Sequence, residues 1–91
     1  MKKTYYAVAH ANGPITRKLA AQTLDDARAE MADADLRAWV DEPATDLEDA
    51  FGECWDGMSE ADVEAAMRQH GMACEDAGSR IVGDWAVWSI A

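Results

Sequence analysis

Few side chains in this chain of 91 residues could ligate a transition metal or act as a nucleophile. Its thiols and imidazoles are Cys54, Cys74, His10 and His70. A structural zinc site needs four converging ligands, usually with closely paired cysteines, and here only His70 and Cys74 stand close together. A cysteine nucleophile needs a histidine beside it in space, so an enzyme would depend on Cys54 or His70. We expect a protein without catalytic residues, metal or cofactor, with reduced thiols rather than a disulfide.

Carboxylates, by contrast, are abundant and concentrated. Eighteen Asp and Glu stand against eight Lys and Arg, which gives a formal net charge of −10. Residues 25–64 hold fifteen of these acids, with only Arg28 and Arg37 as cations, a local net charge of −13. The first 24 residues hold no acid and four cations, Lys2, Lys3, Arg17 and Lys18. A field this negative argues against gripping nucleic acid or anionic membranes directly, and it attracts basic protein partners.

Several acids recur at spacings of three and four, which on a helix place side chains on one face about 5 to 6 Å apart. This spacing resembles that of backbone phosphates, although the row through residue 56 must continue past Gly52. Trp55 lies among acids in an expected loop, where it either anchors a partner or folds back onto the sheet. A solvated, solubilising surface is the alternative. The expected partner-binding residues are Asp26, Glu30, Asp33, Asp46, Asp49, Glu53, Trp55, Asp56, Glu60 and Glu64; Asp41 extends the first row.

The elements that must position these acids follow from local patterns. Residues 4–10 alternate as a strand does, Asn12-Gly13 marks a turn, and residues 4–20 together predict a β-hairpin. A helix over 24–41 begins after Thr23. The sequence of residues 45–48 is a capping box for a short helix that ends at Gly52, and a further helix runs from Ser59 to Gly71.

The C-terminal part predicts strands. Residues 72–76 and 79–82 read as two short extended segments around Ala77-Gly78, and residues 85–91 form a strand with a tryptophan on each face. The economical assembly is a single α+β domain over residues 1–91 with the order ββαααββ. It is a small antiparallel sheet with helices packed on one face.

No secretory signal or membrane span is expected. The apolar stretch after Lys3 is short and is broken at Asn12, Gly13 and Pro14, and no run of about 18 apolar residues exists. These features predict a cytoplasmic protein. We expect it to be a monomer or a small homo-oligomer.

In size, acidity, α+β pattern and lack of catalytic motifs, the whole chain resembles phage-encoded anti-CRISPR proteins and other inhibitors that mimic DNA. No residue motif defines that group, so no residue role is carried over. The resemblance implies a non-enzymatic inhibitor in the host cytoplasm that binds a CRISPR effector, at the subunit that reads the PAM, and blocks target DNA. The alternative is a small cytoplasmic adaptor or assembly module that binds a protein partner through an apolar, tryptophan-bearing sheet face.

Overall fold

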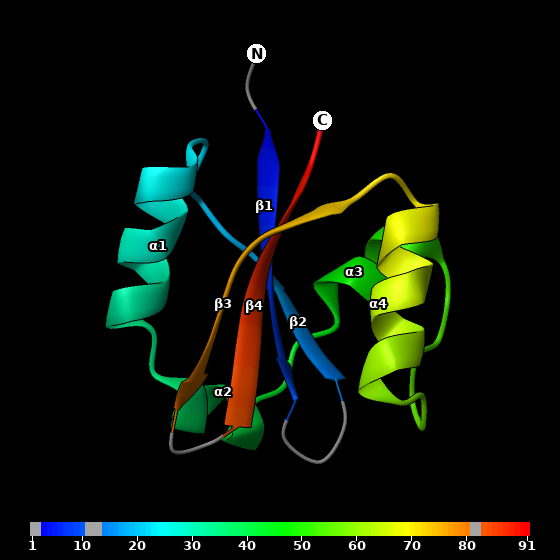
Figure 1. Ribbon diagram of the computed structural model, residues 1–91. Helices are drawn as coiled ribbons and strands as arrows, with labels where there is room; N and C mark the ends of the chain where they lie inside the picture. Colours follow the sequence, from blue (N-terminus) through cyan, green and yellow to red (C-terminus); the bar gives the residue numbers. More distant parts are fainter. Residues whose placement is uncertain (1–2, 11–13, 81–82) are drawn as a thin grey trace.

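The computed structural model describes residues 3–10, 14–80 and 83–91. Two strands come first, then the helical segment, then two strands (Figure 1), so the predicted α+β class and order are confirmed. The elements are β1 (Thr4–His10), β2 (Pro14–Lys18), α1 (Leu24–Asp33), α2 (Leu36–Asp41), α3 (Asp46–Phe51), α4 (Glu60–Gln69), β3 (Ala73–Arg80) and β4 (Gly83–Ile90).

The strands form one antiparallel sheet in the order β2-β1-β4-β3. Strands β1 and β2 pair as the predicted hairpin, and its expected Asn12-Gly13 turn lies outside the described residues. The prediction of two short segments was wrong over the described residues; residues 81 and 82 of the second predicted segment lie outside them. Ala77 and Gly78 remain paired with β4 inside one continuous strand, and the register shifts instead between Cys74 and Asp76. A bulge absorbs this irregularity without ending the strand.

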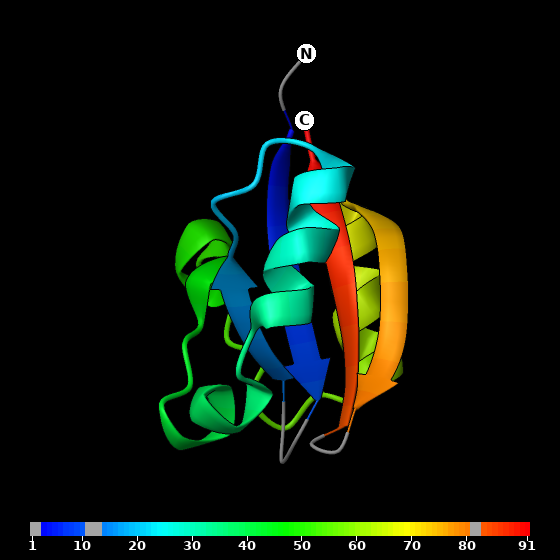
Figure 2. The ribbon, with the colours of Figure 1, turned by 90° about the vertical axis from the view of Figure 1, so that its left-hand side faces the viewer.

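Helices cover both faces of the sheet, so the expectation of helices on one face was wrong. Helix α1 stands against one face and α4 against the other (Figures 1 and 2). The reason is the central strand β1, which has apolar side chains on both faces and is buried along residues 5–9. A near-continuous apolar run is typical of a strand that is covered on both sides.

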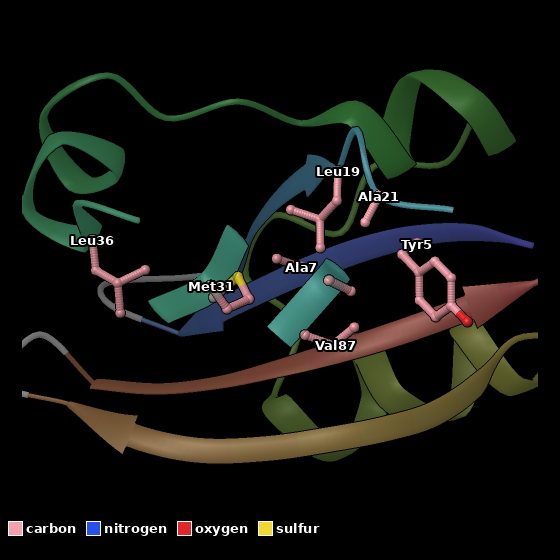
Figure 3. Close-up of a cluster of buried hydrophobic side chains, with 8 residues drawn as sticks. Tyr5, Ala7, Leu19, Ala21, Met31, Leu36 and Val87 are labelled. Atoms are coloured by element: carbon pink, nitrogen blue, oxygen red, sulfur yellow. The ribbon is translucent and has the colours of Figure 1, made fainter. Parts of the chain in front are cut away.

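Two clusters of buried side chains therefore share the sheet. The α1-side cluster is Tyr5, Ala7, Leu19, Ala21, Ala27, Met31, Leu36 and Val87 (Figure 3). The α4-side cluster is Tyr6, Val8, Leu47, Trp55, Val63, Met67, Met72 and Trp88. Alternate residues of β1 and β4 contribute to opposite clusters because successive strand side chains point to opposite faces.

The helix expected over residues 24–41 is broken at Ala34 and Asp35. Ala34 has extended backbone angles, and the Asp35 carboxylate then accepts hydrogen bonds from the amides of Arg37 and Ala38 at 3.1 and 3.4 Å. An aspartate that caps a new helix cannot also continue the old one, because its backbone is not helical. Because of this break, side chains of α2 do not continue the helical faces of α1.

Three of the predicted helix boundaries are confirmed. The hydroxyl groups of Thr23 and Ser59 accept hydrogen bonds from the amides of Asp26 and Asp62, and Gly52 ends α3 with φ at +69°. These signals act over three or four residues of the same chain segment, which is why the sequence reveals them.

The capping box expected at Thr45 is not formed. The Thr45 side chain makes no capping hydrogen bond, and the Leu47 amide instead donates to the buried Thr16 hydroxyl of β2 at 3.0 Å. The Thr16 amide donates to the Ala44 carbonyl at 3.1 Å. The N-terminus of α3 is thus fixed to the outer edge of β2, which it covers.

Candidate acidic interface

The expected row of Asp46, Asp49, Glu53 and Asp56 is not a single helical face. Helix α3 ends at Phe51, so Glu53 and Asp56 lie in the loop that follows the helix. Asp46 accepts a hydrogen bond from the Lys18 amide at 2.6 Å. Glu53 accepts one from the Trp55 indole nitrogen at 3.0 Å and lies 3.2 Å from Nε2 of His70. Two members of the row therefore hold the fold together, while Asp49 and Asp56 are exposed.

Trp55 is a core residue, so the alternative that it folds back onto the sheet is confirmed and its place among the partner-binding residues was wrong. It is 1% exposed within the α4-side cluster. Its backbone amide donates to Glu48 and its indole nitrogen to Glu53, both at 3.0 Å. One acid of α3 and one acid of the loop therefore accept from its two N–H groups, and the apolar ring surface is removed from water.

The tryptophans do not form an open sheet face in the described part of the chain. Trp88 is 1% exposed, and Trp39 and Trp85 are partly buried against the α1-side cluster. Helices lie against both faces of the sheet, so the described tryptophans are divided between two covered faces.

One expected acidic row does lie on a single helix face, that of α1, where Asp26 and Asp33 are exposed and Glu30 is half-buried. Asp26, Glu30 and Asp33 are spaced by four and three residues and follow one face of the helix. They border an open hollow of about 480 Å³ together with Ala20, Ala21, Gln22 and Ala29. Glu30 also accepts a hydrogen bond from the Ala20 amide at 3.2 Å, which ties the helix to the segment after β2.

The cation of α1 is directed away from this row. Arg28 Nε lies 3.2 Å from Asp76 Oδ2 on β3, and its Nη1 lies 4.0 Å from Asp25 Oδ1. Asp26 and Asp33 are exposed and form no ion pair with any described residue. The sequence showed the Arg28–Asp25 spacing but not Asp76, which only the sheet brings near. We define Asp26, Glu30 and Asp33 as the α1 acidic face.

The other expected acids lie elsewhere. Asp41 ends α2 beyond the helix break, and Glu60 and Glu64 belong to α4 on the opposite side of the sheet (Figure 1). Glu64 Oε2 lies 3.9 Å from Arg68 Nη1. The residues predicted as one partner-binding surface are thus divided between the two sides of the molecule.

In the described part of the chain, the pKa values of three side chains are shifted by their surroundings. Hydrogen bonds from Trp55 and then His70 lower the pKa of Glu53. The Ser89 hydroxyl, which donates to Glu75 at 2.7 Å, lowers the pKa of that carboxyl. Cys74 is an exposed residue, but partial burial of its sulfur, and secondarily the charge of Glu64, raises the pKa of its thiol. Both shifted carboxyls are thus held in the ionised form by contacts within the fold.

Among the described residues, no three His, Cys, Asp or Glu side chains gather as a metal site, and no helix has the length and apolarity needed to cross a bilayer. Cys54 and Cys74 are free thiols at exposed positions. What the α1 acidic face can do chemically is pair with cations. Comparisons with protein-family models, curated proteins and solved structures found no match.

Proposed function

We propose that this protein is a non-enzymatic inhibitor that places the α1 acidic face on the basic groove of a nucleic-acid-binding protein and competes with its DNA. A CRISPR effector is the first partner to test, and the inhibitor would act in the host cytoplasm. The observation that carries the proposal is the α1 acidic face, with Asp26 and Asp33 exposed and Glu30 half-buried between them, from which Arg28 is drawn away by Asp76.

The dimensions suit a contact with a small number of cations. Asp26 and Asp33 are seven residues apart, which is about 10 Å along a helix axis. Lys and Arg side chains of a DNA-binding groove are arranged to meet phosphates, and carboxylates at comparable separations satisfy the same donors. The hollow beside the helix leaves room for their long side chains. The negative field of the whole chain would also accelerate encounter with a basic partner.

The test is competition with target DNA. A labelled target duplex bound to each of a panel of purified CRISPR effector complexes is titrated with the protein, and displacement is followed by fluorescence anisotropy. We expect displacement from one complex, and we expect raised salt to weaken it because the contact is electrostatic. Failure to displace DNA from any complex would reject CRISPR effectors as the partner class.

Charge reversal then tests the surface. Asp26→Lys with Asp33→Lys should weaken displacement about tenfold, since two exposed attractions become repulsions. Both residues are exposed and without described ion pairs, so the circular dichroism should not change. Asp49→Lys with Asp56→Lys makes the same charge change away from α1 and should have much less effect. Equal losses in the two double variants would show that net charge, not the α1 acidic face, is responsible.

A further inference from the structure

A second hollow, of about 350 Å³, lies on the other side of the sheet between α4 and strands β1, β3 and β4. Four of its lining side chains are at most 1% exposed and belong to the packed core, so they form the wall behind the hollow rather than a surface that a ligand can reach. These four are Val8, Val63, Met67 and Trp88. Its polar lining residues come from all four elements: Glu60, Glu64, His10, Cys74 and Asp84.

The hollow exists because two small residues are paired on the adjacent strands β3 and β4, on the face of the sheet toward α4. Ala77 of β3 pairs with Ala86 of β4, and both line the hollow. Two residues further along β4, the much larger Trp88 pairs with Cys74. Methyl groups at the alanine pair leave space between the sheet and the N-terminal half of α4. Space of this size, partly apolar and bordered by a few polar groups, is typical of small-ligand sites.

The carboxylates give the opening a negative character. Glu60 is exposed and forms no ion pair with a described residue. Glu64 forms an ion pair with Arg68, whose Nη1 lies 3.9 Å from Glu64 Oε2. The Arg68 guanidinium also lies 5.2 Å from the centre of the Trp88 ring. The raised pKa of the Cys74 thiol, caused by burial and then by Glu64, keeps that group neutral. The chemistry on offer is thus an apolar floor beneath carboxylates that can accept from an ammonium group.

We propose that this hollow binds a small organic cation with an apolar body, of the class of the aralkyl amines. The apolar body would cover Ala77, Trp85 and Ala86, the apolar lining residues that keep exposed surface, and the ammonium group would lie between Glu60 and Glu64. Charge complementarity selects the cation, and the apolar floor selects a ligand with a hydrocarbon body over a bare metal ion. The site lies across the sheet from the α1 acidic face and does not depend on the proposed function.

The probe is 2-phenylethylamine, compared with 2-phenylethanol and phenylacetate, which share the hydrocarbon body but carry a neutral and a negative group. Titrations of the full chain are followed by the amide chemical shifts of residues lining the hollow. We expect saturable shifts around Val63 and Ala86 with the amine, weaker ones with the alcohol and none with the acid. Equal binding of the alcohol or the acid would overturn the proposal.

Matched variants separate the site from general attraction to an acidic protein. Glu60→Gln with Glu64→Gln should weaken amine binding about fivefold, as expected for the loss of exposed charge pairs. Asp26→Asn with Asp33→Asn removes the same charge from the opposite side and should leave the affinity unchanged. Equal weakening by both pairs, or shifts centred on α1, would reject the site.

A third variant tests the volume without touching charge. Ala77→Leu places a larger side chain in the hollow from an exposed strand position, where it need not disturb the core. We expect it to abolish the saturable shifts while the rest of the amide spectrum is retained. Unchanged amine affinity in a folded Ala77→Leu protein would show that the amine binds elsewhere. Should Ala77→Leu fail to fold, the glutamine variants still decide the outcome.

Discussion

Glu53 shows how one acid can have a structural role in a chain rich in acids. Its carboxylate receives the Trp55 indole N–H and lies beside His70, whose ring stacks on Phe51 with centroids 4.0 Å apart and planes 3° apart. The loop after α3 is thereby joined to the end of α4. An acid predicted to meet a partner instead closes the α4-side cluster over Trp55.

We predict that Glu53→Gln reduces the acid sensitivity of folding. The pKa of Glu53 in the folded chain lies below its ordinary value of 4.5, so folding favours the ionised form. The stability this contributes is present above pH 4.5 and is lost as the pH falls through the folded-state pKa. The amide of Gln can still accept from Trp55 but does not titrate. Urea unfolding at pH 7 and pH 3 should therefore show a smaller difference in midpoint for the variant than for the wild type.

Glu60→Gln provides the matched control for that comparison, because Glu60 is an exposed glutamate without a described ion pair. Its pH difference should stay close to that of the wild type. The lowered pKa of Glu75 contributes to the acid sensitivity of all three proteins and cancels from the comparison. A Glu53→Gln protein with the full wild-type difference would contradict the structural role of the Glu53 carboxylate.

Helix α3 shows that an element can depend on a cap from outside its own sequence. Its six residues are too few for independent stability. The Thr16 hydroxyl accepts from the Leu47 amide, and the Lys18 amide donates to Asp46. This contact covers the outer edge of strand β2 and supplies hydrogen-bond partners to the first two residues of α3.

We predict that Thr16→Val lowers the free energy of unfolding by about 1–3 kcal/mol, the cost of leaving a buried amide without an acceptor. Thr16 is 2% exposed, so water does not readily replace the hydroxyl. Thr16→Ser keeps the acceptor and should lose less. Thr45→Ala, at the position that the capping box favoured, should change stability by no more than about 0.5 kcal/mol. Urea unfolding of the three variants tests this, and a larger loss for Thr45→Ala than for Thr16→Val would reverse the assignment of the cap.

At the scale of the whole molecule, the sheet divides the acidic charge between two sides. The α1 acidic face lies on one side, and Glu60 and Glu64 lie on the other. Spreading like charges over opposite surfaces lowers their mutual repulsion, because the distance between them exceeds the screening length of about 10 Å at moderate salt. Repulsion within each side remains as a cost to folding.

We predict that raising sodium chloride from about 10 mM to about 300 mM stabilises the protein, because screening of repulsion outweighs the loss of a few exposed ion pairs. The urea midpoint should rise. Asp26→Asn with Asp33→Asn removes two of the ten net negative charges. That variant should start with a higher midpoint at low salt and gain less from added salt. A midpoint that falls with salt would show that the ion pairs of Arg28 and Arg68 dominate.

The sequence by itself determined most of the local structure. The caps at Thr23 and Ser59, the stop at Gly52, the β1–β2 hairpin and the tryptophans on opposite faces of β4 all follow from patterns that span a few residues. It also determined the net charge and the row on α1, because these depend on composition and on the helical repeat.

Only the tertiary structure decided which of these features face water. The pairing order of the strands sets where each helix lies, and helices on both faces buried Trp55 and separated α1 from α4. Thr16 and Thr45, and likewise Arg28 and Asp76, are brought together by contacts between distant segments. Such contacts depend on how complete elements pack, and no pattern within one segment carries that information.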